Sequence, residues 1–265
     1  CMIDGRATSA GPEHLARVQR AWGSHAQLRA LLDASSTQVV VAQPAVKEQQ
    51  PAVQALLAAP DFQLMAIEAE HCVFARARPE LSGLALRVLR PGYETGWLTA
   101  PGLDVAAAHG ELARLPAHPN VQPYSAWVRA MLALRPMLRE GGTAGLAAPR
   151  DAEQRQLLMA ALHELRLSHE ALPLVQTVGA YHGLVATLAC ELDEARQAFA
   201  RTDELGQVRE TLLGAQELAL REGRVEEVRE FLKMTGALEA AQGDGWLLGL
   251  KQELEAGARC DKGAR

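Results

Sequence analysis

The distribution of apolar residues predicts a mainly helical chain, and the strongest pattern lies in residues 171–232. The segment ALPLVQTVGAYHGLVATLAC (171–190) contains no Asp, Glu, Lys or Arg, which predicts a helix buried on all sides. Pro173, His182 and two glycines within it favour a buried helix over a membrane span. Two amphipathic segments follow, ELDEARQAF (191–199) and RVEEVREFL (224–232). They align when the chain is shifted by 33 residues, a period typical of stacked helix pairs.

Helical spacing of apolar residues recurs along most of the remaining chain. Ser125 is expected to be a helix N-cap, and Asp151 with Gln154 resembles a capping box. A terminal capping helix is expected with Trp246, Leu247, Leu250 and Leu254 facing inward. The full set of further helices expected is 12–33 with a break at residues 23–24, 45–58, 105–115, 125–138, 151–167 and 244–257.

The pattern in the N-terminal part is ambiguous. QVVVAQ (38–43) is a strand candidate. Residues 61–78 fit either one helix capped by Asp61 or two strands, FQLMAI and HCVFARA, and a helix-like pattern in 79–89 favours the helix. The N-terminal part is therefore expected to be helical or a small α/β domain. The Gly- and Pro-rich loop 90–104 carries Tyr93 and Trp97, which we expect to pack onto neighbouring helices rather than to serve a function of their own.

Composition agrees with a helical fold. The chain has 265 residues, of which only 4% are aromatic, and Ala and Leu supply most of the apolar residues. A net charge of −5 argues against a nucleic-acid-binding surface. We expect four regions: a flexible tether (1–11), an N-terminal domain (12–120), a helical-repeat domain (121–257) and a disordered tail (258–265).

The four cysteines match no zinc or redox signature. Cys1 resembles the acylated cysteine of a bacterial outer-membrane lipoprotein, which would place the chain on the periplasmic face of that membrane; the alternative is an arbitrary fragment start in a cytoplasmic protein. Cys190 is expected to be a small buried apolar residue. Cys72 and Cys260 carry no further signal.

The sequence offers no catalytic constellation. His163 and His169 begin like zincin motifs, but Leu167 and Pro173 occupy the places of the second histidine. His182, in an uncharged run, is expected to be a satisfied core or groove histidine. We therefore expect no enzyme activity, no metal and no cofactor.

Residues 176–237 resemble tetratricopeptide repeats. Small or apolar residues occupy the family's four packing positions in two units, which are Gly183, Ala186, Ala195 and Phe199, then Gln216, Ala219, Val228 and Leu232. Gln216 is not small, Gln207 stands where the family has proline, and the period is 33 rather than 34. The resemblance implies antiparallel helix pairs stacked as a right-handed superhelix, with Phe199 and Leu232 filling the space between layers.

The resemblance also implies a function and a site. In such arrays the first helix of each unit lines a concave groove that holds a peptide or a helix of another protein. Because two carboxylates lie among the groove positions, a partner with apolar anchors flanked by Lys or Arg is expected. The expected function is a scaffold that helps to assemble an envelope machine such as a pilus or secretion system; the alternative is a ligand-binding or enzymatic module in 12–120. The groove positions are Thr177, Ala180, Leu184, Thr187, Glu210, Leu213, Glu217 and Leu220.

Overall fold

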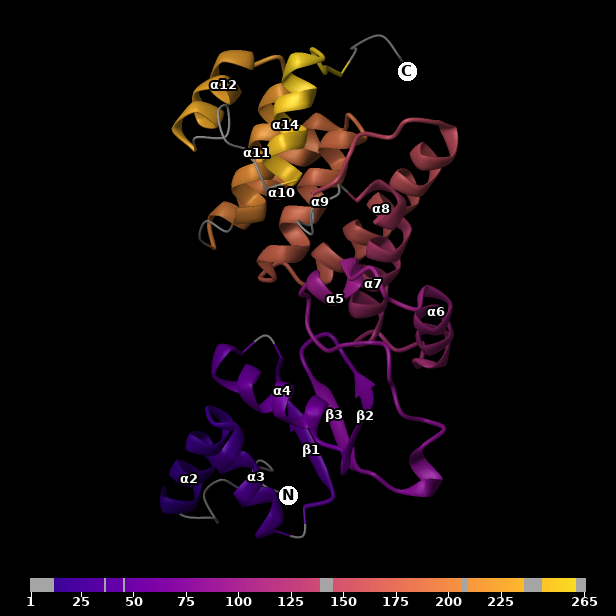
Figure 1. The fold of residues 1–265 in the computed structure, drawn as a ribbon, viewed down its shortest axis with the longest axis vertical. Helices are drawn as coiled ribbons and strands as arrows, with labels where there is room; N and C mark the ends of the chain where they lie inside the picture. The colour runs from indigo at the N-terminus through magenta and orange to yellow at the C-terminus, as the bar shows by residue number, and fades with distance from the viewer. Residues whose placement is uncertain are drawn as a thin grey trace. The chain divides into compact units, whose positions relative to one another are not determined.

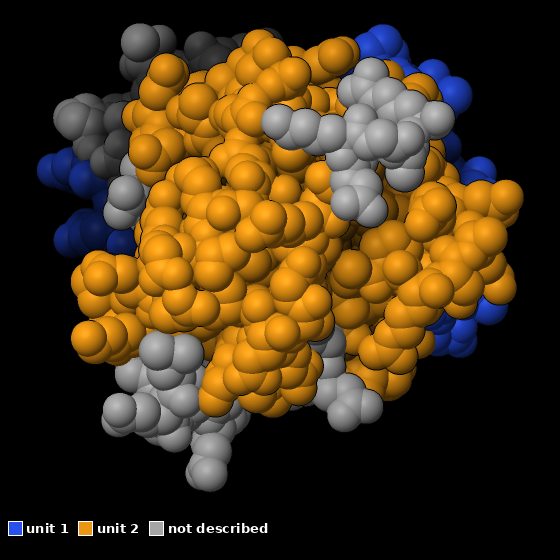
Figure 2. Space-filling model, turned by 90° about the horizontal axis from the view of Figure 1, so that it is seen from above, with its two compact units in different colours: residues 1–92, 104–124 blue, residues 93–103, 125–265 orange. Residues whose placement is uncertain are grey.

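The computed structural model describes residues 12–35, 37–44, 46–138, 145–205, 209–235 and 245–260. Its described part is mainly helical, with one small sheet (Figure 1). The chain divides into two compact units, coloured separately in Figure 2. Unit 1 comprises residues 1–92 and 104–124, and unit 2 comprises residues 93–103 and 125–265. The loop segment 93–103 thus belongs with the C-terminal helices, not with the N-terminal domain in which it was expected.

Unit 1 is a three-stranded antiparallel sheet with helices. The strands are β1 (Val39–Ala42), β2 (Phe62–Ile67) and β3 (Cys72–Arg76), in the order β1-β3-β2. Its helical elements are α2 (Pro12–Trp22), α3 (His25–Asp33), η1 (Lys47–Gln49), α4 (Gln50–Ala58), η2 (Pro79–Leu81) and α6 (Val105–Arg114). The break between α2 and α3 is at the expected place, where the Ser24 hydroxyl accepts a hydrogen bond from the Gln27 N–H.

The helix expected at 61–78 is wrong, and the two-strand alternative is confirmed. Phe62, Leu64 and Phe74 are buried on one face of the sheet, as the two-residue period of strands requires. Asp61 caps no helix but forms ion pairs with Arg29 and Arg76. The expected strand at 38–43 is confirmed as β1.

The helix expected at 79–89 is also wrong. Only the short η2 forms there, and the next segment is a series of turns and bends with one bridge from Leu86 to Leu64. The cause is Glu111 on α6, a 94%-buried residue. Its carboxylate accepts the main-chain N–H groups of Arg87, Val88 and Leu89 at 2.6–3.1 Å. Hydrogen bonds to a carboxylate are strong, so they hold residues 87–89 in this conformation. They outweigh the preference of the local sequence for a helix.

Unit 2 is helical throughout its described elements. These are α5 (Gly96–Thr99), α7 (Gln122–Leu134, which begins at the end of unit 1), η3 (Arg135–Met137), α8 (Ala152–Ala171), α9 (Gln176–Leu188), α10 (Leu192–Asp203), α11 (Arg209–Arg221), α12 (Val225–Met234) and α14 (Gly245–Glu255). Ser125 lies inside α7 rather than capping it. Asp151 does cap α8 by accepting the Gln154 N–H, while Gln154 accepts the N–H of Arg150. Tyr93 is buried and meets Trp127 edge to face, as expected for the aromatic loop.

Helix α9 is the centre of unit 2. Every residue from Val178 to Leu188 is buried, and α8, α10 and α11 all pack against it. This confirms a buried core helix within the uncharged segment, although the helix covers only residues 176–188 and Leu174 before it is 76% exposed. No helix of the described residues is both long and apolar enough to cross a bilayer.

The 33-residue period is present in the backbone. Helix α11 begins and ends 33 residues after α9, and α12 begins 33 residues after α10. Both turns between paired helices have the same hydrogen bond, from Glu191 N–H to Ala186 O and from Arg224 N–H to Ala219 O. Both place a residue in the left-handed region, Cys190 with φ 61° and Gly223 with φ 81°. These are two copies of one helix-pair unit with a shared C-cap.

Helix α14 is the beginning of a third copy. It packs on α11 and α12, and it ends with Gly257 in the left-handed region and an Ala258 N–H to Glu253 O bond. The expected helix is present, with Trp246 and Leu250 buried as expected, while Leu247 and Leu254 are only half-buried. No second helix of a pair follows in the described residues.

Candidate functional site

The residues assigned to a concave groove do not line an open surface. Ala180, Leu184, Thr187, Leu213, Glu217 and Leu220 are all at least 97% buried, and only Thr177 and Glu210 are half-buried. The exposure expected of these positions is therefore wrong. Because α8, α10 and α11 surround α9, the side that would face a groove in an open array is part of the core.

Three of the packing positions, Gly183, Phe199 and Leu232, are buried between helices as expected, whereas Gln216 is half-buried. Phe199 of α10 lies between two helices, and a Cβ placed on Gly183 of α9 or Gly214 of α11 would come within 2.6 Å of its ring. Leu232, its counterpart in the next unit, is fully buried. Glycines on both sides let three helices close around one aromatic ring.

A polar network joins the three helices α8, α9 and α10. Arg166 of α8 forms a two-bond ion pair with Glu194 of α10, with both distances 2.6 Å. Glu194 Oε1 also lies 2.6 Å from His182 Nε2, and His182 Nδ1 lies 2.8 Å from His169 Nδ1. An ionised Glu194 accepts from His182 Nε2–H, so His182 Nδ1 accepts the proton of His169 Nδ1–H. Both imidazoles are then neutral, each with its tautomer fixed by its neighbour.

Burial and neighbouring charges set the pKa values in this network. Burial lowers the pKa of His169 to about 4, with a further lowering from His182. Burial also lowers the pKa of His182, against the opposing effect of its hydrogen bond to Glu194. Hydrogen bonding to Arg166 lowers the pKa of Glu194. His182 is thus a satisfied core histidine, as expected, and the network holds helices together.

An open hollow of about 230 Å³ lies between α10 and α11. We call it the α10–α11 cleft, and Leu212, one of its walls, is 41% exposed. Leu205, 38% exposed, follows α10 nearby in the chain. This cleft was not predicted from the sequence. The feature that could have indicated it is Leu212, an apolar residue on the exposed side of the charged helix α11. The cleft is lined by Phe199, Ala200, Asp203, Thr211, Leu212 and Ala215.

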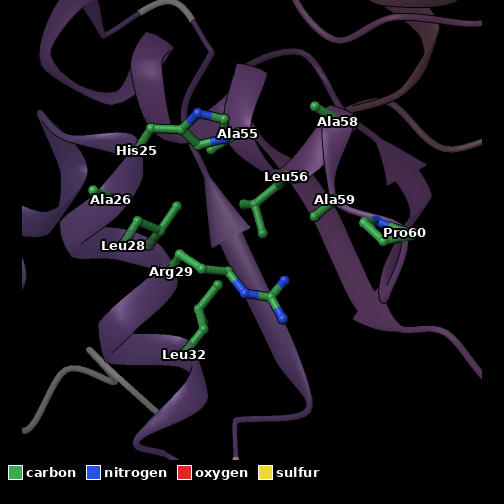
Figure 3. Close-up of a pocket in the computed structure, with 10 residues that line it drawn as sticks. All are labelled: His25, Ala26, Leu28, Arg29, Leu32, Ala55, Leu56, Ala58, Ala59 and Pro60. Atoms are coloured by element: carbon green, nitrogen blue, oxygen red, sulfur yellow. The ribbon is translucent and has the colours of Figure 1, made fainter.

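Unit 1 has a larger apolar pocket of about 420 Å³ between α3 and α4. Leu28 and Leu32 of α3 face Leu56 of α4, and small residues after it keep the space open (Figure 3). Arg29 lies at this pocket but is paired with Asp33 and Asp61. The sequence does not predict this pocket, because the pocket depends on the distance at which α3 and α4 pack.

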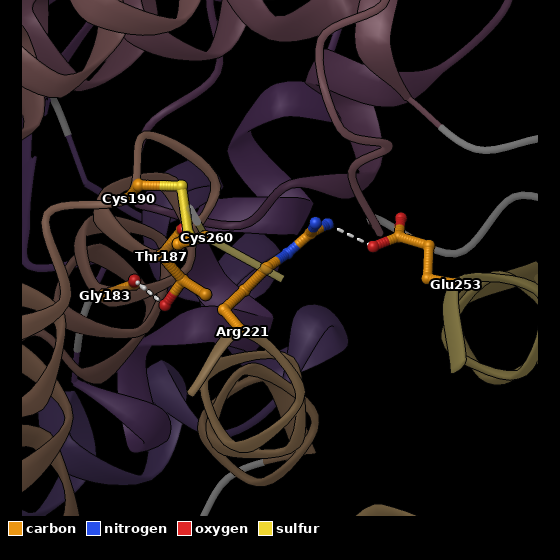
Figure 4. The surroundings of a disulfide bond; sticks show 6 residues. All are labelled: Gly183, Thr187, Cys190, Arg221, Glu253 and Cys260. Carbon is orange, nitrogen blue, oxygen red and sulfur yellow. Dashed lines mark hydrogen bonds and ion pairs between the residues drawn. A yellow bond between two sulfur atoms is a disulfide. The ribbon is translucent and has the colours of Figure 1, made fainter. Parts of the chain in front are cut away.

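A disulfide joins Cys190, at the turn after α9, to Cys260 (Figure 4). Cys190 is exposed rather than a buried apolar residue, so that expectation is wrong. Residues 258–260, expected in a disordered tail, are fixed by this bond and by the Cys260 N–H to Arg221 O bond. Cys72 is a free thiol, and burial raises its pKa to about 12.

No family model, curated protein or solved structure matches the chain. Among the residues with described positions, no three His, Cys, Asp or Glu side chains are grouped to hold a metal ion. Cys1, the expected lipid attachment site, and the tether 1–11 lie outside the described residues.

Proposed function

We propose that this protein is a non-catalytic scaffold that binds another protein through the α10–α11 cleft. The observation that carries the proposal is an apolar hollow with an exposed leucine on a unit built from repeated helix pairs. Repeated helix pairs present long, rigid surfaces suited to protein binding. An apolar side chain of a partner inserted into the cleft would bury apolar surface on both proteins, which favours association.

The lining of the cleft defines the chemistry of the partner. Phe199, Leu212 and two alanines accept an apolar side chain, while Asp203 favours a Lys or Arg beside it. The proposed partner is therefore a segment with an apolar anchor next to a basic residue, and it binds at the α10–α11 cleft rather than at the groove expected from the sequence.

The disulfide supports a location in an oxidising compartment such as the bacterial periplasm, where disulfides form and persist. In that compartment the scaffold would serve the assembly of an envelope machine. Acylation of Cys1 stays a prediction, which the mass of the N-terminal peptide of the native protein would test.

Site-specific photo-crosslinking tests the cleft. A benzophenone amino acid replaces Leu212 in one variant and Met159 of α8 in a matched control, because the two side chains are 41% and 43% exposed. We expect one discrete cross-linked product in cells from position 212 and none from position 159. Asp203→Lys should reduce the yield at position 212 at least threefold. Equal products from both positions would refute the cleft.

The α3–α4 pocket supports a second function, binding of a small apolar molecule by unit 1. Its volume suits a ligand of modest size, and its buried leucines provide an apolar surface. Ala58→Phe should fill the pocket and abolish enhancement of an apolar dye's fluorescence, while Ala106→Phe on the exposed side of α6 should not. Dye binding that ignores both substitutions would exclude this function.

A further inference from the structure

The C-terminal segment follows the repeat up to one point and then departs from it. Cys190, Gly223 and Gly257 end α9, α11 and α14 with the same left-handed turn. After the first two turns the chain enters the second helix of the pair. After Gly257 the chain instead passes the turn at Gly223 and reaches the turn at Cys190. We call residues 256–260 the strap.

Contacts at each turn hold the strap in place. Arg259 lies against the second turn, where a Cβ on Gly223 would be 3.6 Å from its guanidinium carbon. The Cys260 N–H donates to Arg221 O at the same turn. Cys260 then bonds to Cys190 at the first turn, with 5.7 Å between the Cα atoms (Figure 4). The strap therefore fastens α14 to both complete helix pairs.

Cys190, at the first turn, has a backbone conformation that favours glycine. The left-handed region is unfavourable for a residue with a Cβ, and the equivalent position in the next unit is glycine. Cysteine stands there at a conformational cost that its disulfide offsets. The bond is accessible to reductants, because Cys190 is exposed and Cys260 is half-buried.

Helix α14 is short and packs on α11 and α12. It has 11 residues, too few for a stable isolated helix. Only Trp246 and Leu250 among its large apolar side chains are fully buried, and one ion pair joins Glu253 to Arg221 of α11. The surface it covers on α11 and α12 is where the first helix of a further unit would pack.

We propose that the Cys190–Cys260 disulfide is a redox latch that keeps α14 over a second binding surface on α11 and α12. A dithiol reductant cleaves the bond. One of its thiolates attacks Cys190 Sγ, Cys260 leaves as a thiolate and takes up a proton, and the second thiol resolves the mixed disulfide. The products are two cysteine thiols and the oxidised reductant. The exposed surface then accepts an amphipathic helix of a partner with large apolar residues four positions apart, like Trp246 and Leu250.

This inference extends the proposed scaffold function but is tested at a different surface. The probe is a fluorescent peptide with the sequence of residues 245–255, titrated against the full chain and followed by anisotropy. Oxidised protein should not bind it, while protein reduced with dithiothreitol should bind at least tenfold more tightly. A peptide with Leu250→Arg is the control and should bind neither form.

Cys190→Gly is the matched variant, since it copies Gly223 and keeps the turn relaxed. It should bind the peptide without reductant, and its α14 amides should exchange at least tenfold faster than in the oxidised wild type. Protected α14 amides and no peptide binding in this variant would overturn the latch. So would equal binding by the oxidised and reduced wild type. Neither result would alter cross-linking at Leu212, so failure of the latch is distinguishable from failure of the proposed function.

Discussion

At the scale of single residues, the close approach of α9, α10 and α11 depends on Gly183 and Gly214, which lie against the ring of Phe199. Gly183→Ala places a Cβ about 2.6 Å from Phe199, so the ring or a helix must move. We expect a loss of about 1–3 kcal/mol in the free energy of unfolding. Urea denaturation followed by circular dichroism measures this.

Gly110 in α6 provides the control for that substitution. It is an exposed helical glycine, and a Cβ there meets nothing within 4 Å. Gly110→Ala should therefore leave stability unchanged or raise it by up to about 1 kcal/mol. Equal losses from both substitutions would contradict the account of the helix junction.

The buried histidines predict loss of stability in acid. Burial lowers the folded-state pKa of His169 from 6.5 to about 4, so between these values the unfolded chain binds a proton that the folded chain does not. Stability is then lost as pH falls below about 6.5, by roughly 1.4 kcal/mol per pH unit for one such group. His182, whose pKa is also lowered, adds to the slope in the same direction.

His169→Gln isolates this effect. Its amide can still donate to His182 Nδ1 but does not titrate in this range. Urea unfolding at several pH values from 7 to 4 should give a flatter dependence in the variant than in the wild type. An unchanged slope would show that His169 does not control the acid response.

At the scale of elements, one carboxylate decides the course of the segment after η2. Glu111 accepts three main-chain N–H groups from residues 87–89. Glu111→Ala leaves these donors without their acceptor and should cost about 2–4 kcal/mol. Glu111→Gln keeps one acceptor oxygen and should cost less. Amide exchange of residues 87–89 should accelerate in the order wild type, Gln, Ala, and any other order would contradict this role.

The elements also show what the sequence could and could not predict. The 33-residue period, the buried α9 and the Phe199 packing position are local or periodic signals, so they were readable. The helix expected at 79–89 is wrong because Glu111, which holds residues 87–89 in another conformation, lies at least 22 positions further along the chain. A pattern of neighbouring residues does not reveal such a contact. The prediction of an open groove is wrong for a related reason. The exposure of residues on α9 and α11 depends on which other helices cover them, and the local sequence does not show this. Cys190 could have been recognised from its alignment with Gly223, the glycine of the equivalent turn.

At the scale of the whole molecule, the two units should respond differently to removal of the Cys190–Cys260 disulfide. The disulfide spans 70 residues of unit 2, and a cross-link of that length restricts the unfolded chain by about 4 kcal/mol. Cys190→Gly should therefore lower the unfolding free energy of unit 2 by somewhat less, because it also relieves the left-handed turn. Trp97, Trp127 and Trp246 lie in this unit. They report on it by fluorescence once Trp22 of unit 1 is replaced by Phe in both proteins.

Unit 1 carries its own reporter in the buried thiol of Cys72. A thiol whose pKa is raised to about 12 by burial is protonated and unreactive at neutral pH until its surroundings open. Alkylation of Cys72 at increasing urea concentrations, quantified by mass spectrometry of its peptide, therefore follows unfolding of unit 1. We expect Cys190→Gly to shift the tryptophan transition to lower urea and to leave the Cys72 transition in place. If both transitions moved together, the units would unfold as one cooperative body and the strap would stabilise the whole chain.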